Sequence, residues 1–214
     1  YKNVKFIKTK INNYVSKLNV LMSLSKTKWV LLIDADYEIN KNFKTFLNSK
    51  KLLNSISGYS FPIFNVVKNK IIWENIYPSK ILLFNKNKAF FKRDGHKEKI
   101  IISGKIKKLK YFFLHNDKKD NDRWMQTQIK WATFDAKKII NSKFLELKLI
   151  DRLRLIPFCS IFVSFFYFFF LKKIFIYGSA GFFYLKQRLI YEITINYMIF
   201  KFLFQKIYQS KKKS

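Results

Sequence analysis

The chain is short of cysteine, acidic residues and arginine, and each shortage limits what it can be. Its single cysteine excludes an internal disulfide framework and a cysteine-rich zinc module. Acidic residues number 13 against 43 Lys and Arg, which gives a formal net charge of +30. Only five of those 43 are arginine, the residue that grips phosphates and guanines bidentately, so we expect no nucleic-acid partner. Anionic partners such as lipid headgroups or sugar nucleotides stay compatible with the charge.

Glycine and proline are also scarce, with five and three residues, whereas Lys, Asn, Ile and Phe are abundant throughout. We interpret this as a bias of the whole composition that inflates the net charge. With 49% hydrophobic residues, the chain is too apolar for intrinsic disorder. Its 214 residues suit one domain, or one domain with an appendage.

The composition divides the chain near residue 150. Residues 1–150 mix short apolar runs with polar turns and are expected to form one domain. Residues 151–214 hold only Asp151 and Glu192 as acids, against eleven basic residues. This second part is therefore a basic tail with a different environment from the domain before it.

The tail contains two uncharged stretches, 155–171 and 174–185. The first has seventeen residues, about the lower limit for crossing a bilayer as a helix, and the second is too short to cross. Flanking lysines and embedded aromatic residues are typical of helices that lie in the membrane interface. We therefore expect a membrane-associated helical tail over 151–214. A buried helical hairpin or an oligomer contact is the alternative.

Strand-like and helix-like segments alternate through the first 150 residues, which predicts an α/β domain. Apolar residues at helical spacing predict helices over 15–25, 42–53 and 122–147. Short apolar runs predict strands over 4–7, 29–33, 59–67, 81–84 and 100–102. The run at 29–33, WVLLI, is continuous and is typical of a central strand covered on both faces.

Asp34 and Asp36 come directly after this apolar run. Ligands of open α/β sheets bind outside the carboxyl ends of the strands. Two carboxylates at this spacing can both reach a loop-bound cation, and Mg²⁺ or Mn²⁺ held in this way keeps positions open for substrate phosphates. The motif favours a divalent-cation site. A solvated strand end with a helix-capping Asp is the alternative.

Three segments together resemble glycosyltransferase family 2. LNVLMSLSKTKWVLLIDADYEI resembles the centre of that family, where an apolar strand delivers an Asp-x-Asp to a nucleotide-sugar diphosphate. FPIFNVVKNKIIWENIYPSKILLFNKNKAFFKRDGHKEKI resembles its acceptor-side stretch, with Tyr-Pro, Leu-Phe and Asp-Gly-His elements. LHNDKKDNDRWMQTQIKWATFDAKKI is similar to a subgroup of membrane-associated enzymes of bacterial cell-envelope glycans. The resemblance runs from about Val4 to about Lys206 and implies a GT-A-like, Rossmann-like sheet followed by a hydrophobic helical region.

The family begins with a strand, a loop and a helix that bind the nucleotide base. The residues at the start of this chain do not supply them, and Tyr1 is neither an initiator methionine nor the start of a secretory signal. We expect the chain to be a fragment in which 1–150 is a glycosyltransferase domain without its first β-α units.

The resemblance also implies roles for individual residues. Asp36 would hold the divalent cation, Mg²⁺ or Mn²⁺, with Asp34 contacting the ribose or the same metal shell. For the base that takes the acceptor proton, Asp94 is the first candidate and Glu98 the second. His96 would be a metal or phosphate ligand, or the base itself.

Three further residues are candidates for binding the diphosphate. Relatives often carry a basic residue just before the Asn that corresponds to Asn19, and here Lys17 would replace it because Leu18 occupies that position. His115 stands at the end of an apolar run and would bind the diphosphate, with an ordinary strand-end histidine as the alternative.

The implied activity is metal-assisted transfer of a sugar, with inversion, from a nucleotide-diphospho-sugar to a cell-envelope glycan such as lipopolysaccharide, or to a lipid-linked acceptor. The implied location is the cytoplasmic face of the bacterial inner membrane. A catalytically degenerate, membrane-attached basic scaffold is the competing hypothesis, and a hydrolase that uses the same metal site is a third.

Overall fold

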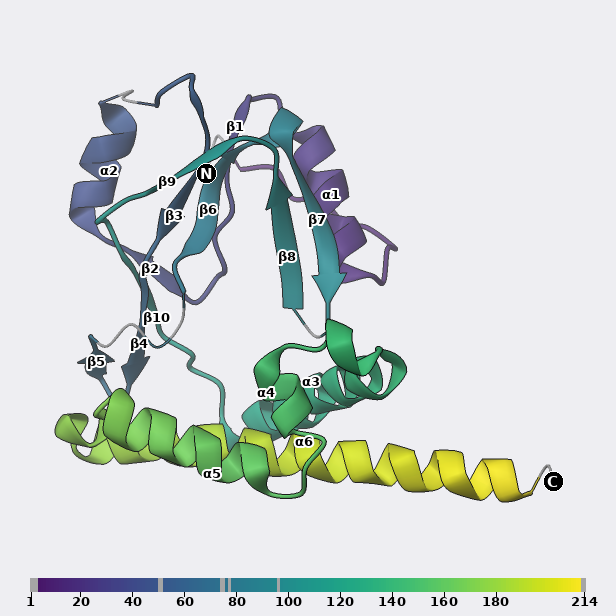
Figure 1. Ribbon diagram of the computed structural model, residues 1–214. Helices are drawn as coiled ribbons and strands as arrows, with labels where there is room; N and C mark the ends of the chain where they lie inside the picture. Colours follow the sequence, from purple (N-terminus) through teal and green to yellow (C-terminus); the bar gives the residue numbers. More distant parts are fainter. Residues whose placement is uncertain (1–3, 50–51, 74–75, 77, 96, 213–214) are drawn as a thin grey trace.

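The computed structural model describes residues 4–49, 52–73, 76, 78–95 and 97–212. Strands and two helices form one side of the molecule, and a layer of further helices lies beneath them (Figure 1). This arrangement confirms the α/β class that the alternating segments predict. The described strands form mixed sheets, with parallel and antiparallel neighbours, and not a purely parallel sheet.

The first sheet has the strand order β1-β6-β3-β9. Its strands are β1 (Trp29–Leu31), β3 (Ile56–Phe61), β6 (Lys80–Asn85) and β9 (Lys105–Lys108). Strand β6 runs antiparallel to both neighbours, and β9 runs parallel to β3. The prediction that the run at 29–33 is a central, doubly covered strand is wrong. Among the described strands β1 lies at the edge of this sheet and is half-buried. The central strands are β3 and β6, and their residues are largely buried.

The second sheet has the order β2-β10-β4-β5. Its strands are β2 (Tyr37–Ile39), β4 (Ile63–Val67), β5 (Lys70–Ile72) and β10 (Phe113–His115). The single strand expected over 59–67 is divided between the two sheets at Pro62, which has no N–H to give to a ladder. Strand β10 pairs antiparallel with β2 and parallel with β4, so it joins two distant segments of the chain.

Helix α1 (Tyr14–Leu24) packs on a separate hairpin formed by β7 (Ala89–Asp94) and β8 (Lys97–Ile102). The Asn13 side chain accepts hydrogen bonds from two N–H groups of the first turn, which fixes the start of the helix. Leu18 and Met22 are buried against Phe84 and Phe91. The helix expected over 15–25 is thereby confirmed to within a residue at each end.

Helix α2 (Lys41–Asn48) covers the other core of the strand region. Phe43 is fully buried and contacts the rings of Phe61 and Phe113, which come from different sheets. The helix is shorter than the 42–53 expected, since it ends at Asn48.

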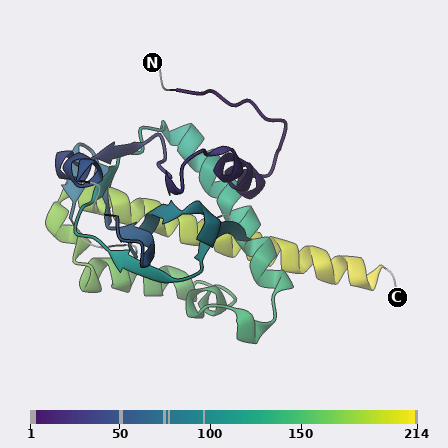
Figure 2. The ribbon, with the colours of Figure 1, turned by 90° about the horizontal axis from the view of Figure 1, so that it is seen from above.

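The helical layer begins with α3 (Asn121–Asn141), which Asp120 caps, and which ends before the expected residue 147. Helices α4 (Leu149–Leu153), α5 (Cys159–Phe166) and α6 (Ser179–Lys211) follow. Short turns connect these elements or lie between strands: η1 (Lys86–Lys88), η2 (Phe144–Glu146), the π-helical η3 (Tyr167–Leu171) and η4 (Ile174–Tyr177). Figure 2 shows α5 and α6 side by side, crossing under the strands.

The tail shares its cores with the first 150 residues. Tyr191, Ile195 and Ile199 of α6 pack against Ala132 and Ala136 of α3. At the other end of α6, Tyr184 and Leu185 join a cluster that includes residues of β4 and β5. No helix within the described part of the chain is long and apolar enough to cross a bilayer.

The strand expected over 4–7 does not form. Val4 and Phe6 are largely exposed, so these side chains bury little apolar surface against the body of the protein.

Candidate functional site

Asp34 and Asp36 lie just beyond the carboxyl end of β1, where the sequence places them. The Tyr37 N–H donates to the Asp34 carbonyl oxygen at 3.1 Å, which closes a tight turn between β1 and β2. Both aspartates are half-buried. The turn therefore presents two carboxylates at the rim of the second sheet.

Strand register brings three side chains from distant segments next to this turn. In β2, β10 and β4, Tyr37 is paired with His115, and His115 is paired with Asn65. The rings of Tyr37 and His115 meet edge to face, with centroids 5.6 Å apart. Because paired residues of adjacent strands lie side by side, one row across the sheet contains all three.

His115 links the acidic turn to this row. Its Nε2 lies 3.2 Å from Oδ2 of Asp36, and its Nδ1 lies 3.1 Å from Oδ1 of Asn65. The Asn116 N–H donates to the Asp36 carbonyl oxygen at 3.0 Å and holds the turn against the end of β10. About a third of each side chain of the Asp36–His115 pair is exposed, so a ligand can reach the pair.

Tyr37 connects Asp34 to a lysine. The Lys80 Nζ donates to the Tyr37 hydroxyl at 2.7 Å, and the hydroxyl is hydrogen-bonded to the Asp34 carboxylate. Burial, followed by the charge and hydrogen bond of Asp34, raises the pKa of Tyr37 far above its usual value. Tyr37 therefore keeps its proton and donates a hydrogen bond to the Asp34 carboxylate, while Lys80 adds a positive charge at the edge of the site.

The residues present fit a divalent cation at Asp36. Its Oδ1 is buried and has no hydrogen-bond partner, whereas Oδ2 faces His115. A buried carboxylate oxygen without a partner is costly unless a cation or an unseen water satisfies it. The described residues form no cluster of three or more metal-ligating side chains. Asp36 and His115 would thus supply part of the coordination, and phosphate oxygens and water the rest, as Mg²⁺ usually requires.

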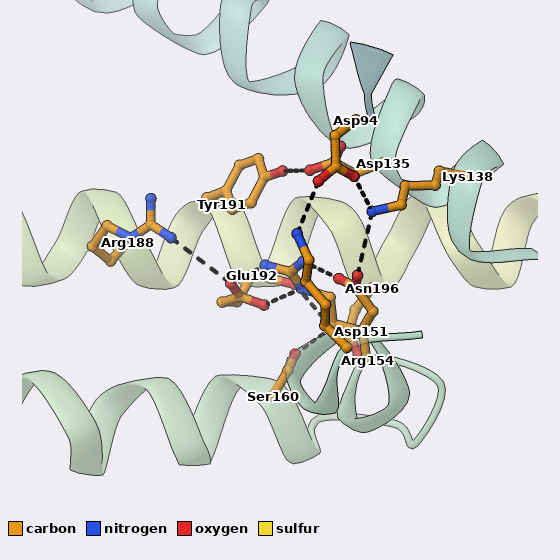
Figure 3. Close-up of polar contacts among 11 residues, drawn as sticks. Asp94, Asp135, Lys138, Asp151, Arg154, Ser160, Arg188, Tyr191, Glu192 and Asn196 are labelled. Atoms are coloured by element: carbon orange, nitrogen blue, oxygen red, sulfur yellow. Dashed lines mark hydrogen bonds and ion pairs between the residues drawn. The ribbon is translucent and has the colours of Figure 1, made fainter. Parts of the chain in front are cut away.

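Asp94 is at the far end of β7 and is engaged by two lysines. Lys138 of α3 approaches Oδ1 at 2.5 Å, and Lys148 approaches Oδ2 at 2.9 Å (Figure 3). These hydrogen bonds lower the pKa of Asp94 to about 2. Gly95, which follows it, has a φ of +66°, and a Cβ there would collide with the Asp135 carboxylate. His96 lies outside the described residues.

Glu98 differs from Asp94 because its charge acts on two tyrosines that the charge of Asp34 also affects. It is half-buried on β8. Its charge contributes to the raised pKa of Tyr14 and of Tyr37, after burial and after Asp34 in both cases. The charges of Asp34 and Glu98 therefore act on the same two tyrosines. Asp94, by contrast, is bound by Lys138 of α3 and by Lys148.

Asn19 has a different environment from the one expected of a diphosphate ligand. Its side chain donates to the Phe91 carbonyl oxygen at 3.1 Å and accepts from the Phe91 N–H at 2.9 Å. These two bonds fasten α1 to β7. Lys17 is half-buried one turn after Tyr14 on the same helix. Burial, followed by the charge of Asp34, raises the pKa of Tyr14.

A chain of ion pairs, half-buried at Asp94 and Lys138 and buried from Asp151 onward, attaches this hairpin to the tail helices (Figure 3). Lys138 lies 3.7 Å from Asp151, and Asp151 accepts from Arg154 at 2.9 Å. Arg154 also donates two hydrogen bonds to Glu192, at 2.9 and 2.6 Å. Burial by itself would lower the pKa of Arg154, but the bonds to Glu192 outweigh it and raise that pKa. The only two acids of the tail are both used in this network.

Tyr37, Asn65 and Lys80 belong to the site but were not among the residues expected from the sequence. Tyr37 stands beside the Asp-x-Asp and could have been suspected from that position. Asn65 and Lys80 carry no signal, because only the pairing of β10 with β4 and the course of β6 bring them near.

Scanning protein-family models gives no match to this chain, and no curated protein matches it either.

Proposed function

We propose that the chain carries the cation and acceptor side of a glycosyltransferase site of the GT-A type. In this proposal a sugar moves from a nucleotide-diphospho-sugar to a cell-envelope glycan or a lipid-linked acceptor, at the cytoplasmic face of a bacterial membrane. The observation that carries the proposal is the meeting of Asp36 and His115 beyond β1, with one Asp36 oxygen buried and unpartnered. The resemblance to glycosyltransferase family 2 supports it independently of this geometry.

The diphosphate of the donor is the group that this site suits. A cation at Asp36, when bound, offsets the negative charge that grows on the departing nucleoside diphosphate. Asp36 and His115 would hold it. In this proposal Lys80, which is bonded to Tyr37, and Lys17 of α1 attract phosphate oxygens, and Asp34, held by Tyr37, faces the ribose.

The acceptor hydroxyl must lose a proton as its oxygen attacks the anomeric carbon. That bond forms while the bond from the anomeric carbon to the phosphate oxygen breaks, and the proton passes to a carboxylate. Glu98 suits this role better than Asp94. Two lysines hold the Asp94 carboxylate, and a pKa of about 2 makes it a weak base, whereas the charge of Glu98 acts on the same tyrosines as that of Asp34.

The test uses sugar-labelled nucleotide-diphospho-sugars with a bacterial envelope extract as acceptor. We expect label to move to extracted glycan or lipid in the presence of Mn²⁺ and to stay on the donor when a chelator is added. Electron paramagnetic resonance measures the affinity for Mn²⁺. This affinity should rise when a nucleoside diphosphate is present and should fall in Asp36→Asn. Absence of transfer together with Mn²⁺ binding that Asp36→Asn leaves unchanged would contradict the proposal.

A further inference from the structure

Helix α6 has an apolar stripe that no part of the described chain covers. Positions 182, 193 and 204 recur every eleven residues, as do 197 and 208, and eleven residues make about three helical turns. These positions therefore share one side of the helix. Side chains along this stripe are all more than half exposed: Phe182, Ile193, Tyr197, Phe204, Ile207 and Tyr208.

A second stripe of the same kind runs from Phe158, the N-cap residue of α5, through α5 and into η3. Phenylalanines recur every four residues and are again more than half exposed: Phe158, Phe162, Phe166 and Phe170. Ser160 and Ser164 on the opposite side are buried, and Ser160 accepts a hydrogen bond from Asn196 of α6 at 2.8 Å. The serines thus face α6, and the phenylalanines face outward.

Both stripes point away from the rest of the protein. The opposite side of α6 packs on α3 through Tyr191, Ile195 and Ile199, and α3 lies between α6 and the strand region. Helices α5 and α6 form the lowest layer in Figure 1. Ten large apolar side chains, each more than half exposed, present on the order of 1,000 Å² of apolar surface. The largest apolar patch on a typical soluble monomer is about 300–600 Å².

The charge on this layer has one sign. Asp151 and Glu192 are the only acids after residue 150, and both are buried in the Arg154 network. Lys186 lies within the α6 stripe, Lys201 lies at its margin, and both are exposed. An apolar surface surrounded by cations and without exposed carboxylates complements an anionic lipid surface. A second copy of the chain would instead bring like charges together.

We propose that the outer face of α5 and α6 binds the surface of an anionic bilayer, with its aromatic side chains at the boundary of headgroups and acyl chains. The helices lie along the membrane and do not cross it. Because the stripe follows the length of α6, the surface keeps the body of the protein on one side of the membrane. This inference rests on the surface alone and not on the sugar transfer proposed above.

The experiment is co-sedimentation with lipid vesicles, using phosphatidylcholine alone or with phosphatidylglycerol. Wild-type protein should bind the phosphatidylglycerol vesicles and should be released by added NaCl. Phe166→Gln/Phe204→Gln should bind roughly tenfold or more weakly, because two exposed rings no longer enter the lipid. Glutamine keeps the helix propensity, so the variant should fold. The matched control is Phe90→Gln, since Phe90 on β7 is 54% exposed, close to the 56% of Phe166.

A second pair of variants separates this face from net charge. Lys186→Glu/Lys201→Glu should lose binding to phosphatidylglycerol vesicles. Lys105→Glu/Lys107→Glu on β9 changes the net charge equally and should bind within about twofold of wild type.

Three results would overturn the proposal. The first is wild-type protein that stays in solution with phosphatidylglycerol vesicles. The second is equal vesicle binding by Phe166→Gln/Phe204→Gln and its control Phe90→Gln, or by Lys186→Glu/Lys201→Glu and its control Lys105→Glu/Lys107→Glu. The third is a lipid-free dimer, seen by sedimentation velocity, that Phe166→Gln/Phe204→Gln dissociates, because a second copy would then cover the face.

Discussion

The Nε2 of His115 lies 3.2 Å from the Oδ2 of Asp36, although 79 residues separate the two in the chain. The contact exists because β10 pairs with β2 in a register that places His115 opposite Tyr37, the residue after Asp36. It leaves the other oxygen of Asp36 buried and without a partner. This pair is the centre of the site that we propose for sugar transfer.

Asp36→Asn should abolish transfer, or lower it by at least about 10²-fold, since an amide cannot supply the charge that a cation needs. The loss should appear in the rate of label transfer at saturating Mn²⁺. Asp117→Asn is the control, because Asp117 is an acid near His115 that is bound to Lys119. Turnover by Asp36→Asn equal to that of the control would remove Asp36 from the site.

Glu98→Gln should lower turnover by about 10²–10⁴-fold with little change in donor binding, as expected for loss of a general base. Asp94→Asn should have a smaller effect on the rate per folded molecule, because that carboxylate is bound to Lys138 and Lys148. Kinetics of both variants, corrected for the folded fraction, test the order. A larger loss in Asp94→Asn than in Glu98→Gln would return the role to Asp94.

The Asp94 carboxylate should make stability depend on pH in acid. Its pKa is lowered from 3.8 to about 2, so its contribution is complete above roughly pH 4 and disappears as the pH falls toward 2. We expect on the order of 1 kcal/mol, less than the full shift implies because Lys148 is largely exposed. Urea unfolding at a series of pH values should show this slope in wild type. Asp94→Asn should be less stable at neutral pH and should converge with wild type near pH 2.

Glu192→Gln should destabilise the protein strongly. Glu192 is 1% exposed and accepts two hydrogen bonds from Arg154, so the substitution leaves a buried guanidinium without its full counter-charge. Breaking a buried pair in this way costs about 3–5 kcal/mol. The midpoint temperature of thermal unfolding should fall by roughly 10 °C. Glu146→Gln, at an exposed position of η2, should leave the midpoint almost unchanged.

Gly181→Ala should loosen the junction between η4 and α6. A Cβ at Gly181 would collide with the backbone carbonyl of Ile174, and backbone cannot move aside as a flexible side chain can. We expect a loss of about 1–3 kcal/mol in unfolding free energy. Gly178→Ala is not a matched control, because Gly178 has a φ of +59°. Ala180→Gly, one position away on the same helix, supplies the comparison.

Local sequence patterns are enough to predict the α/β class, the positions of α1 and the acidic turn, and the uneven distribution of acids. These features are local: apolar spacing predicts a helix, an Asn before it caps it, and an Asp-x-Asp after an apolar run lies at a strand end. The same local reasoning misplaced β1 at the centre of a sheet. An uninterrupted apolar run does not reveal which neighbours it will have.

Which residues meet depends on how distant segments pack in three dimensions. Asn65 and His115 come together through a parallel pairing of β4 with β10, and no pattern within either segment specifies that partner or its register. The two tail acids illustrate the same limit, because their positions in the sequence do not reveal that both bind Arg154 in the interior. Local sequence sets what a segment can form, whereas packing between segments distant in the chain sets which side chains share a site and which face stays exposed.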